Sequence, residues 1–156
     1  MRVWFCSLIM VVGGGLPPFP LQAGDRGGRA EYVGGTVAAV PDSSKGFIDI
    51  TDESHFVFQS KAVTLQVPYA KVSLLEYGQK ADRRYALAVL VSPVLLLSKK
   101  RKHFLTLGFT DEAGRQQALV FRLDKSDVRA VLVSLEVKTG LKVQYQDEEA
   151  RKAGKG

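Results

Sequence analysis

The chain has 156 residues, of which 46% are hydrophobic and 24% are charged, and its formal net charge is +6. These proportions are those of an ordinary globular protein with a hydrophobic core, and the length predicts one domain. The single cysteine excludes a fold that depends on several disulfides, so the core itself must stabilise the chain.

The first residues have the layout of a secretory signal peptide. Met1-Arg2 is a short basic start, Val3–Val12 is almost wholly apolar, and small residues follow. This order predicts a signal peptide over residues 1–23, with cleavage between Ala23 and Gly24. The apolar part is short for a transmembrane helix; the alternatives are an uncleaved anchor or a misplaced start codon. We therefore expect export to the periplasm or cell envelope.

The next segment separates this leader from the domain. Residues 24–29 are rich in glycine and charge, which predicts a flexible leader, with the domain running from residue 30 to 146. Glu31–Val40 carries apolar and β-branched residues around Gly34-Gly35. That pattern predicts a strand with a bulge or a sharp bend.

Short extended segments follow in close succession. Gly46–Thr51 and His55–Gln59 flank turn residues and predict a hairpin. Val63–Val67 alternates apolar and polar residues, as a strand with one buried face does. After Pro68 the extended pattern resumes over Tyr69–Tyr77.

An apolar segment with basic ends is the unusual feature of the chain. Tyr85–Leu97 contains a single polar side chain, Ser92, and is divided by Pro93. Basic residues flank it and account for most of the positive charge: Arg83, Arg84, Lys99, Lys100, Arg101 and Lys102. We expect these six residues to be the contact residues of the protein.

Three interpretations of this segment remain open. Basic ends attract anionic lipid headgroups while apolar side chains enter the acyl boundary, so a peripheral membrane contact is one interpretation. Apolar runs of this length more often belong to a protein core, which is the second. A protein-docking patch is the third. A bilayer-spanning helix is disfavoured by the length and by Pro93, and we expect no nucleic-acid partner.

The last third of the chain predicts a hairpin and a helix. His103–Thr110 and Arg115–Leu123 flank a turn that ends in Gly114, where a positive φ is expected. Apolar residues then recur at helical spacing, at Val128, Val131, Leu132 and Leu135. Asp124 is the expected N-cap of this helix and Gly140 its C-terminal glycine. Residues 147–156 carry small and charged residues, which predicts a disordered tail.

These elements together predict a mainly β domain: an antiparallel bent sheet or barrel of six to seven strands, capped by one C-terminal helix. The order of strands, the segment VPYAKVSLLEYG and the hairpin HFLTLGFTDEAGRQQALVFRL resemble pleckstrin-homology-like domains of the GRAM-like and bacterial kind. The resemblance implies a seven-stranded barrel closed at one end by a helix, which binds lipids or proteins without catalysis. The basic first loop of phosphoinositide-binding members is missing, so the resemblance does not extend to phosphoinositides.

Catalytic and metal-binding motifs are absent from the sequence. There is no Walker A loop, GxSxG or HExxH pattern, and we expect no cofactor. The two histidines, His55 and His103, are interpreted as strand residues. We therefore expect a non-enzymatic binding or adaptor domain that contacts an anionic lipid surface. The alternatives are a structural or protein-interaction domain with the apolar segment in its core, and an enzyme whose site residues are dispersed.

Overall fold

A computed structural model describes residues 27–79 and 102–155. Its elements are β1 (Gly27–Gly35), β2 (Ser44–Asp49), β3 (His55–Ser60), β4 (Thr64–Pro68), the 3-10 turn η1 (Tyr69–Lys71), β5 (Val72–Gly78), β6 (His103–Thr110), β7 (Gln116–Leu123), α3 (Val128–Thr139), β8 (Gln144–Tyr145) and α4 (Glu148–Lys155). The predicted signal peptide and the apolar segment Tyr85–Leu97 lie outside the described residues.

The strands form one sheet in the order β4-β3-β2-β1-β7-β6-β5-β8. All neighbours are antiparallel except β5 and β8, which are parallel. The mainly β prediction is confirmed. The prediction of six to seven antiparallel strands was wrong in detail, because the short strand β8 adds an eighth, parallel neighbour. The sheet is also open, since β4 and β8 are its edges.

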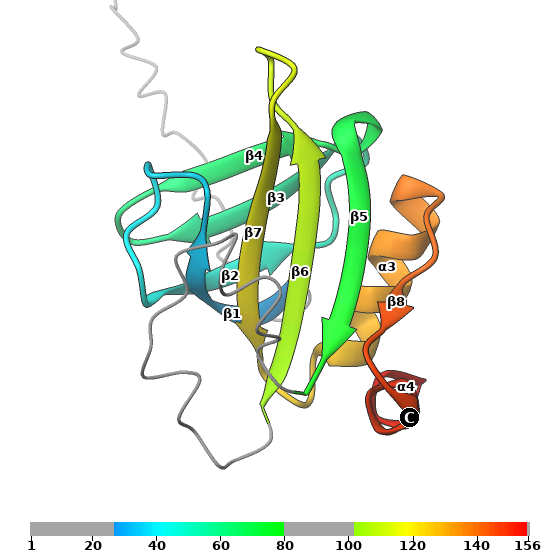
Figure 1. The fold of residues 1–156 in the computed structure, drawn as a ribbon. Helices are drawn as coiled ribbons and strands as arrows, with labels where there is room; N and C mark the ends of the chain where they lie inside the picture. Colours follow the sequence, from blue (N-terminus) through cyan, green and yellow to red (C-terminus); the bar gives the residue numbers. More distant parts are fainter. Residues whose placement is uncertain (1–26, 80–101, 156) are drawn as a thin grey trace, which may run out of the picture.

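Strand β1 belongs to both halves of this sheet. Its first residues pair with β2, and its second half pairs with β7. The register shifts between Tyr32 and Gly34, which confirms the predicted bulge. Because of this shared strand, β2–β4 pass behind β5–β7 and the two halves enclose a common interior (Figure 1).

Aromatic side chains fill this interior. The ring of Phe121 on β7 lies 5.6 Å from Tyr32, 5.5 Å from Phe56 and 4.9 Å from Phe58, measured between centroids. All four side chains are fully buried. Phe121 therefore joins residues from both halves into one core.

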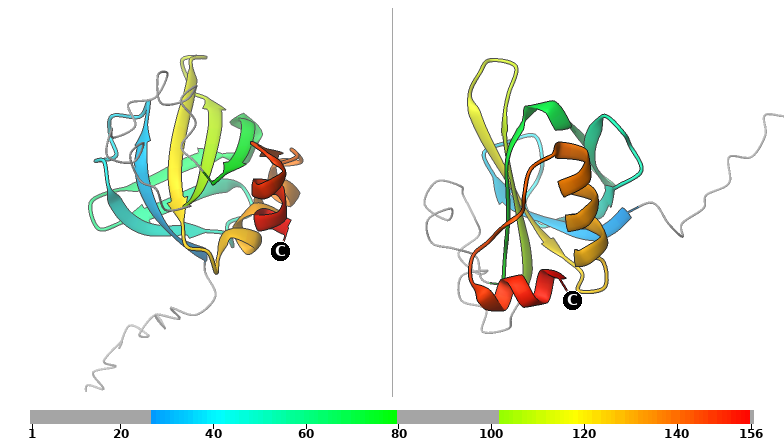
Figure 2. Two further views of the ribbon diagram at one scale, coloured as in Figure 1. Left: turned by 60° about the horizontal axis from the view of Figure 1, so that its bottom comes forward. Right: turned by 90° about the vertical axis from the view of Figure 1, so that its right-hand side faces the viewer.

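Helix α3 lies along the open side of the interior, beside β5 (Figure 2, right). Its buried residues are Val128, Val131, Leu132 and Leu135, the predicted stripe, and Gly140 ends it with a φ of 71°. The predicted N-cap Asp124 was wrong, because the helix begins at Val128 and Asp127 precedes it. The carboxylate of Asp127 accepts a hydrogen bond from the backbone N–H of Arg29 at 2.8 Å, so it ties the helix to β1 instead of capping it.

The predicted flexible leader over residues 24–29 was wrong for its last three residues. Gly27, Gly28 and Arg29 form the start of β1 and pair with β2. A Cβ atom on Gly28 would lie 2.4 Å from a methyl group of Val131 on α3. Glycine at this position allows the close approach of helix and strand, so the glycines here serve packing rather than flexibility.

The predicted disordered tail was also wrong, because Glu148–Lys155 forms helix α4. The Asp147 carboxylate accepts the backbone N–H of Ala150 at 2.6 Å, which is an N-cap bond. Ala150 and Gly154 are buried, and a Cβ atom on Gly154 would lie 2.7 Å from the ring of Tyr145. Small residues therefore bring α4 close to the sheet where large apolar residues are missing.

Candidate functional site

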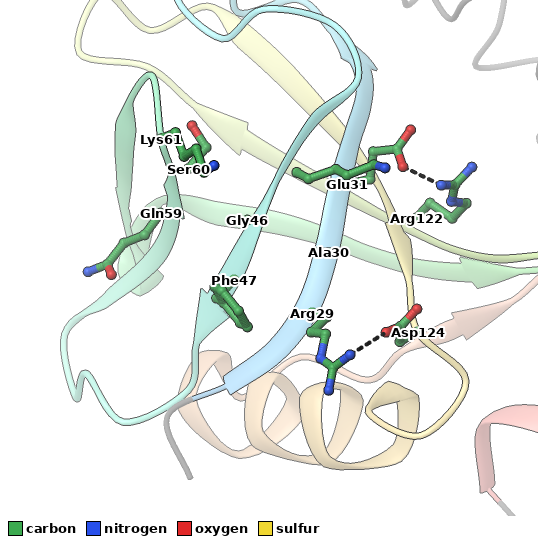
Figure 3. A pocket seen from close by; sticks show the side chains of 11 residues that line it. Arg29, Ala30, Glu31, Gly46, Phe47, Gln59, Ser60, Lys61, Arg122 and Asp124 are labelled. Carbon is green, nitrogen blue, oxygen red and sulfur yellow. Dashed lines mark hydrogen bonds and ion pairs between the residues drawn. The ribbon is translucent and has the colours of Figure 1, made fainter. Parts of the chain in front are cut away.

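The main cleft lies on the outward face of β1, β2, β3 and β7, on the side of the sheet opposite the core (Figure 3). Its volume is about 640 Å³. Strand residues alternate between the two faces, so Arg29 and Glu31, on either side of the core residue Ala30, and Phe47, before the core residue Ile48, line this cleft. The cleft is lined by Arg29, Ala30, Glu31, Lys45, Gly46, Phe47, Gln59, Ser60, Lys61, Arg122 and Asp124.

Two cross-strand rows arrange these side chains. Arg29, Phe47 and Gln59 lie opposite one another on β1, β2 and β3. Neighbouring strands are about 4.8 Å apart, so residues in such a row are in direct reach of one another. The second row joins Arg122 on β7 to Glu31 on β1 and then to a lysine, Lys45, on β2.

Ion pairs neutralise part of the cleft. Arg122 donates a short hydrogen bond to the carboxylate of Glu31, and the Arg29 guanidinium lies 3.9 Å from the carboxylate of Asp124 (Figure 3). Glu31 is thus engaged by the arginine in its row. Lys45, on its other side, makes no hydrogen bond or ion pair with any residue that the structure describes.

The unpaired groups define what the cleft can bind. Lys61, in the turn after β3, also lacks an ion-pair or hydrogen-bond partner among residues 27–79 and 102–155. Phe47 is 56% exposed, which is unusual for a phenylalanine, and it lies between the arginine and glutamine of its row. Two free ammonium groups beside an exposed ring suit an anionic ligand with an apolar part.

Only one of the six sequence-predicted contact residues is among those that the structure describes. Arg83, Arg84, Lys99, Lys100 and Arg101 lie outside the described residues, as do Ala23 and Gly24 of the predicted cleavage site. Lys102 is described: its backbone N–H donates to the carbonyl of Gln79 at 3.3 Å. The two ends of the connection between β5 and β6 therefore lie side by side, and we call this pair the stem.

Both histidines begin strands, as predicted. The backbone N–H of His55 donates to Asp52 at 2.6 Å, and the backbone N–H groups of Ser54 and His55 lower the pKa of that carboxyl. His103 shares a short hydrogen bond through Nδ1 with the hydroxyl of Tyr77. Burial, followed by the nearby charge of Lys125, lowers the pKa of His103, and burial raises the pKa of Tyr77 to about 12.

Two other kinds of site, a metal site and a membrane span, are not found among the described residues. Within residues 27–79 and 102–155, no group of three or more histidine, cysteine, aspartate or glutamate side chains is placed to hold a metal ion. No helix in the same part of the chain combines the length and the apolar character needed to cross a bilayer.

Comparison with known proteins adds no family. The chain matches no protein-family model and no curated protein. The cleft was missed by the sequence reading, because its residues come from four separate strands. One signal was available: Phe47 alternates with Ile48 and so falls on the polar face of its strand, where an aromatic residue is out of place.

Proposed function

We propose that the chain is an exported, non-enzymatic binding module with a pleckstrin-homology-like barrel, which contacts an anionic membrane surface by electrostatic attraction. The contact residues are Arg83, Arg84, Lys99, Lys100, Arg101 and Lys102. The two antiparallel meanders, β1–β4 and β5–β7, followed by α3, support the proposed fold. The eighth strand, the second helix and the open edge are departures from it.

The observation that carries the proposal is the stem. Because Gln79 and Lys102 are hydrogen-bonded, the connection leaves and re-enters the sheet at one point. Extended chain advances at most about 3.5 Å per residue, so Arg84 and Lys99 are within roughly 18 Å of that point. Under the proposal, the basic residues of both ends meet the same anionic surface, and each contributes about 1 kcal/mol beside a charged leaflet.

The cleft supports an anionic partner independently. Gly78, next to the stem, lies opposite Phe104 on β6. Phe104 belongs to the same cross-strand row as Arg122, Glu31 and Lys45. From Phe104 to Lys45 this is three strand spacings, or about 15 Å. The free lysine of the cleft thus lies on the same face of the sheet as the stem, so one negatively charged surface can meet both.

Co-sedimentation with vesicles tests the proposal. We expect the chain to bind vesicles that contain phosphatidylserine, to ignore neutral phosphatidylcholine vesicles, and to dissociate as salt rises. A variant with glutamate at Lys99, Lys100, Arg101 and Lys102 should lose binding. The matched control changes the same charge elsewhere, with glutamate at Lys71, Arg129, Lys142 and Lys152. Equal binding by the two variants would leave only attraction by net charge, and no binding by the unmodified chain would refute the proposal.

A protein-interaction domain is the second candidate, and the cleft is the observation that favours it. An exposed phenylalanine between an arginine and a glutamine is a feature of protein interfaces as well as of ligand sites. If the chain ignores anionic vesicles yet folds normally, this candidate becomes the preferred one, and Phe47→Ala would then weaken capture of the partner.

A further inference from the structure

The charges that line the cleft on β1, β2, β3 and β7 do not cancel. Four of the lining side chains are basic and two are acidic, so the cleft has a net charge of +2. Each acid is matched by an arginine, Glu31 by Arg122 and Asp124 by Arg29. The excess positive charge therefore belongs to the two lining lysines.

These two lysines are neighbours across the strands. Gly46 pairs with Ser60 in the antiparallel ladder of β2 and β3. The residue before Gly46 and the residue after Ser60 therefore come side by side, and these are Lys45 and Lys61. Both are exposed, and neither makes an ion pair or hydrogen bond with any described residue. Like charges at neighbouring positions repel each other, so an anion bound between them relieves this repulsion.

A ligand with two negative charges matches this pair. A phosphate monoester carries a charge of about −1.5 to −2 at pH 7, and its three acceptor oxygens can accept hydrogen bonds from both ammonium groups. A carboxylate or a sulfonate carries one charge and leaves one lysine without a counterion. The charge of the cleft therefore favours a phosphate monoester.

The cleft also has an apolar contact close to the lysines. Phe47 follows Lys45 by two residues on β2, so the two side chains lie on the same face, about 7 Å apart along the strand. The residue is 56% exposed and lies between Arg29 and Gln59 (Figure 3). An open aromatic surface at this distance suits the organic group of an ester.

We propose that the cleft is a binding site for a phosphate monoester that carries an apolar group. Lys45 and Lys61 bind the phosphate, and Phe47 contacts the apolar group. The cleft volume of about 640 Å³ is in the range of small-molecule sites. The inference uses described residues of the cleft alone, so it does not depend on the membrane proposal, which concerns the basic residues beside the stem.

An NMR titration of the full chain with 1-naphthyl phosphate tests the site. We expect the backbone amide resonances of residues 45–47 and 59–61 to shift and to saturate. 1-Naphthalenesulfonate has the same ring with one charge, and inorganic phosphate has the charge without the ring. Each should bind about tenfold more weakly than 1-naphthyl phosphate, as expected for the loss of one charged hydrogen bond or one apolar contact. Equal affinity for the sulfonate and the phosphate ester would overturn the inference.

Substitutions in the cleft separate its two parts. The double variant Lys45→Gln, Lys61→Gln should weaken binding of 1-naphthyl phosphate more than tenfold, whereas Phe47→Ala should weaken it without changing the affinity for inorganic phosphate. The matched control is Lys71→Gln, Lys142→Gln, which removes the same charge at exposed positions outside the cleft and should bind as the unmodified chain does. Equal losses in the two double variants would mean attraction by net charge only, and would overturn the inference.

Thermal unfolding guards against variants that fold poorly. A ligand that binds only the folded state stabilises it, so 1-naphthyl phosphate should raise the unfolding midpoint of the unmodified chain. The double variant at Lys45 and Lys61 should keep its own midpoint when the ester is added. A normally folded chain that does not bind the ester refutes the inference, and leaves the cleft to a protein partner.

Two further arms identify the source of the phosphate and keep the two proposals separate. Vesicles with phosphatidic acid present a phosphate monoester on a lipid. If the double cleft variant binds these vesicles more weakly than the unmodified chain, the ligand is the lipid; unchanged vesicle binding, with loss of 1-naphthyl phosphate, identifies a soluble ester. The variant with glutamate at Lys99, Lys100, Arg101 and Lys102 should still bind 1-naphthyl phosphate, so the membrane proposal can fail while this one holds.

Discussion

Strands β2 and β6 are both interior strands of one sheet, yet they are buried differently. In β2 only Ile48 is fully buried, and its neighbours on either side reach the cleft or the solvent. In β6 the six residues Phe104–Phe109 are all buried. Strand β2 therefore has a solvent face that can receive a ligand, whereas the middle of β6 is buried on both faces.

The two sequences already differ in this way. Strands covered on both faces tend to be apolar throughout, whereas strands with one wet face alternate. In β6, HFLTLGFT has two threonines as its polar side chains after His103 and no charged residue beyond that histidine. In β2, SKGFID places the charged residues Lys45 and Asp49 among apolar or small residues. Binding surfaces are therefore expected on the β2 side, and packing surfaces on the β6 side.

The largest effect is expected from Phe121→Ala, because this ring joins the two halves from the inside. Its removal leaves a cavity among Tyr32, Phe56 and Phe58, which should lower the free energy of unfolding by about 3–5 kcal/mol. Denaturant unfolding measures the change. Phe47→Ala, on the wet face of β2, is the control and should cost no more than about 0.5 kcal/mol. Similar losses for the two variants would erase the distinction between the faces.

Val120→Asp tests the outer face of β7 directly. Burial of an unpaired carboxylate at a covered position should cost on the order of 3 kcal/mol. The comparison variant is Gln59→Asp on the wet face of β3, where the new charge is hydrated and the cost should be within about 0.5 kcal/mol. If Val120→Asp were tolerated as well as Gln59→Asp, the outer face of β5–β7 would have to be open to water.

Glu31→Gln tests the border between the two halves, where β1 meets β7. The carboxylate pairs with Arg122, and the two side chains are partly buried. Loss of the pair should cost about 1 kcal/mol, since partly exposed ion pairs contribute little. A double-mutant cycle with Arg122→Ala isolates the pairing energy.

Glu31→Gln also releases Arg122 from its ion pair, so this variant should strengthen the attraction of an anion to the cleft. Weaker anion binding by Glu31→Gln would argue against a cationic site.

The smallest effect is expected at the turn between β6 and β7. The backbone N–H of Arg115, followed by the side-chain amide of Gln117, lowers the pKa of Asp111 from 3.8 to about 2. The folded state therefore holds the carboxylate ionised, so this contribution is complete above pH 4 and is lost as pH falls toward 2. Asp111→Asn should flatten the pH dependence of the unfolding midpoint in that window. An unchanged slope would show that the turn does not hold this charge.

Much of the fold could be predicted because its signals are local. The stripe of α3 depends only on helical spacing, and Gly140 and Gly114 occupy the positive-φ positions predicted for them, with φ of 71° and 77°. The bulge of β1 coincided with its glycine pair. Each of these features is set by neighbours within a few residues, so one sequence is sufficient.

The errors came from small residues whose role depends on a distant partner. Gly28 was read as flexible, but it is where Val131 of α3 approaches β1. Ala150 and Gly154 carry too little apolar surface to predict a helix, yet both are buried, and Gly154 lies against the rings of Tyr145 and Tyr77 on β8 and β5. Asp124 met the rule for an N-cap, but a turn from Asp124 to Asp127 precedes the helix, and Asp127 bonds to the distant Arg29.

The cleft could not be predicted for a related reason. Lys45 lies opposite Glu31, yet it has no partner among the described residues, while Arg122 on another strand engages that carboxylate. This outcome depends on the register of β1 with β2 and β7, which no local pattern specifies. The export signal and the function of the basic ends stay predictions, because they concern residues outside those described.

The double pairing of β1 has a consequence for how the protein folds. Strands β1–β4 form a local meander that can assemble as soon as they are synthesised, but the other edge of β1 must wait for β7, near the end of the domain. Contacts between distant parts of a chain slow folding and leave strand edges unpaired in the meantime. The ribosome therefore releases half a sheet with an open edge and an unfilled aromatic core, and this interval is when the nascent chain is most exposed to aggregation.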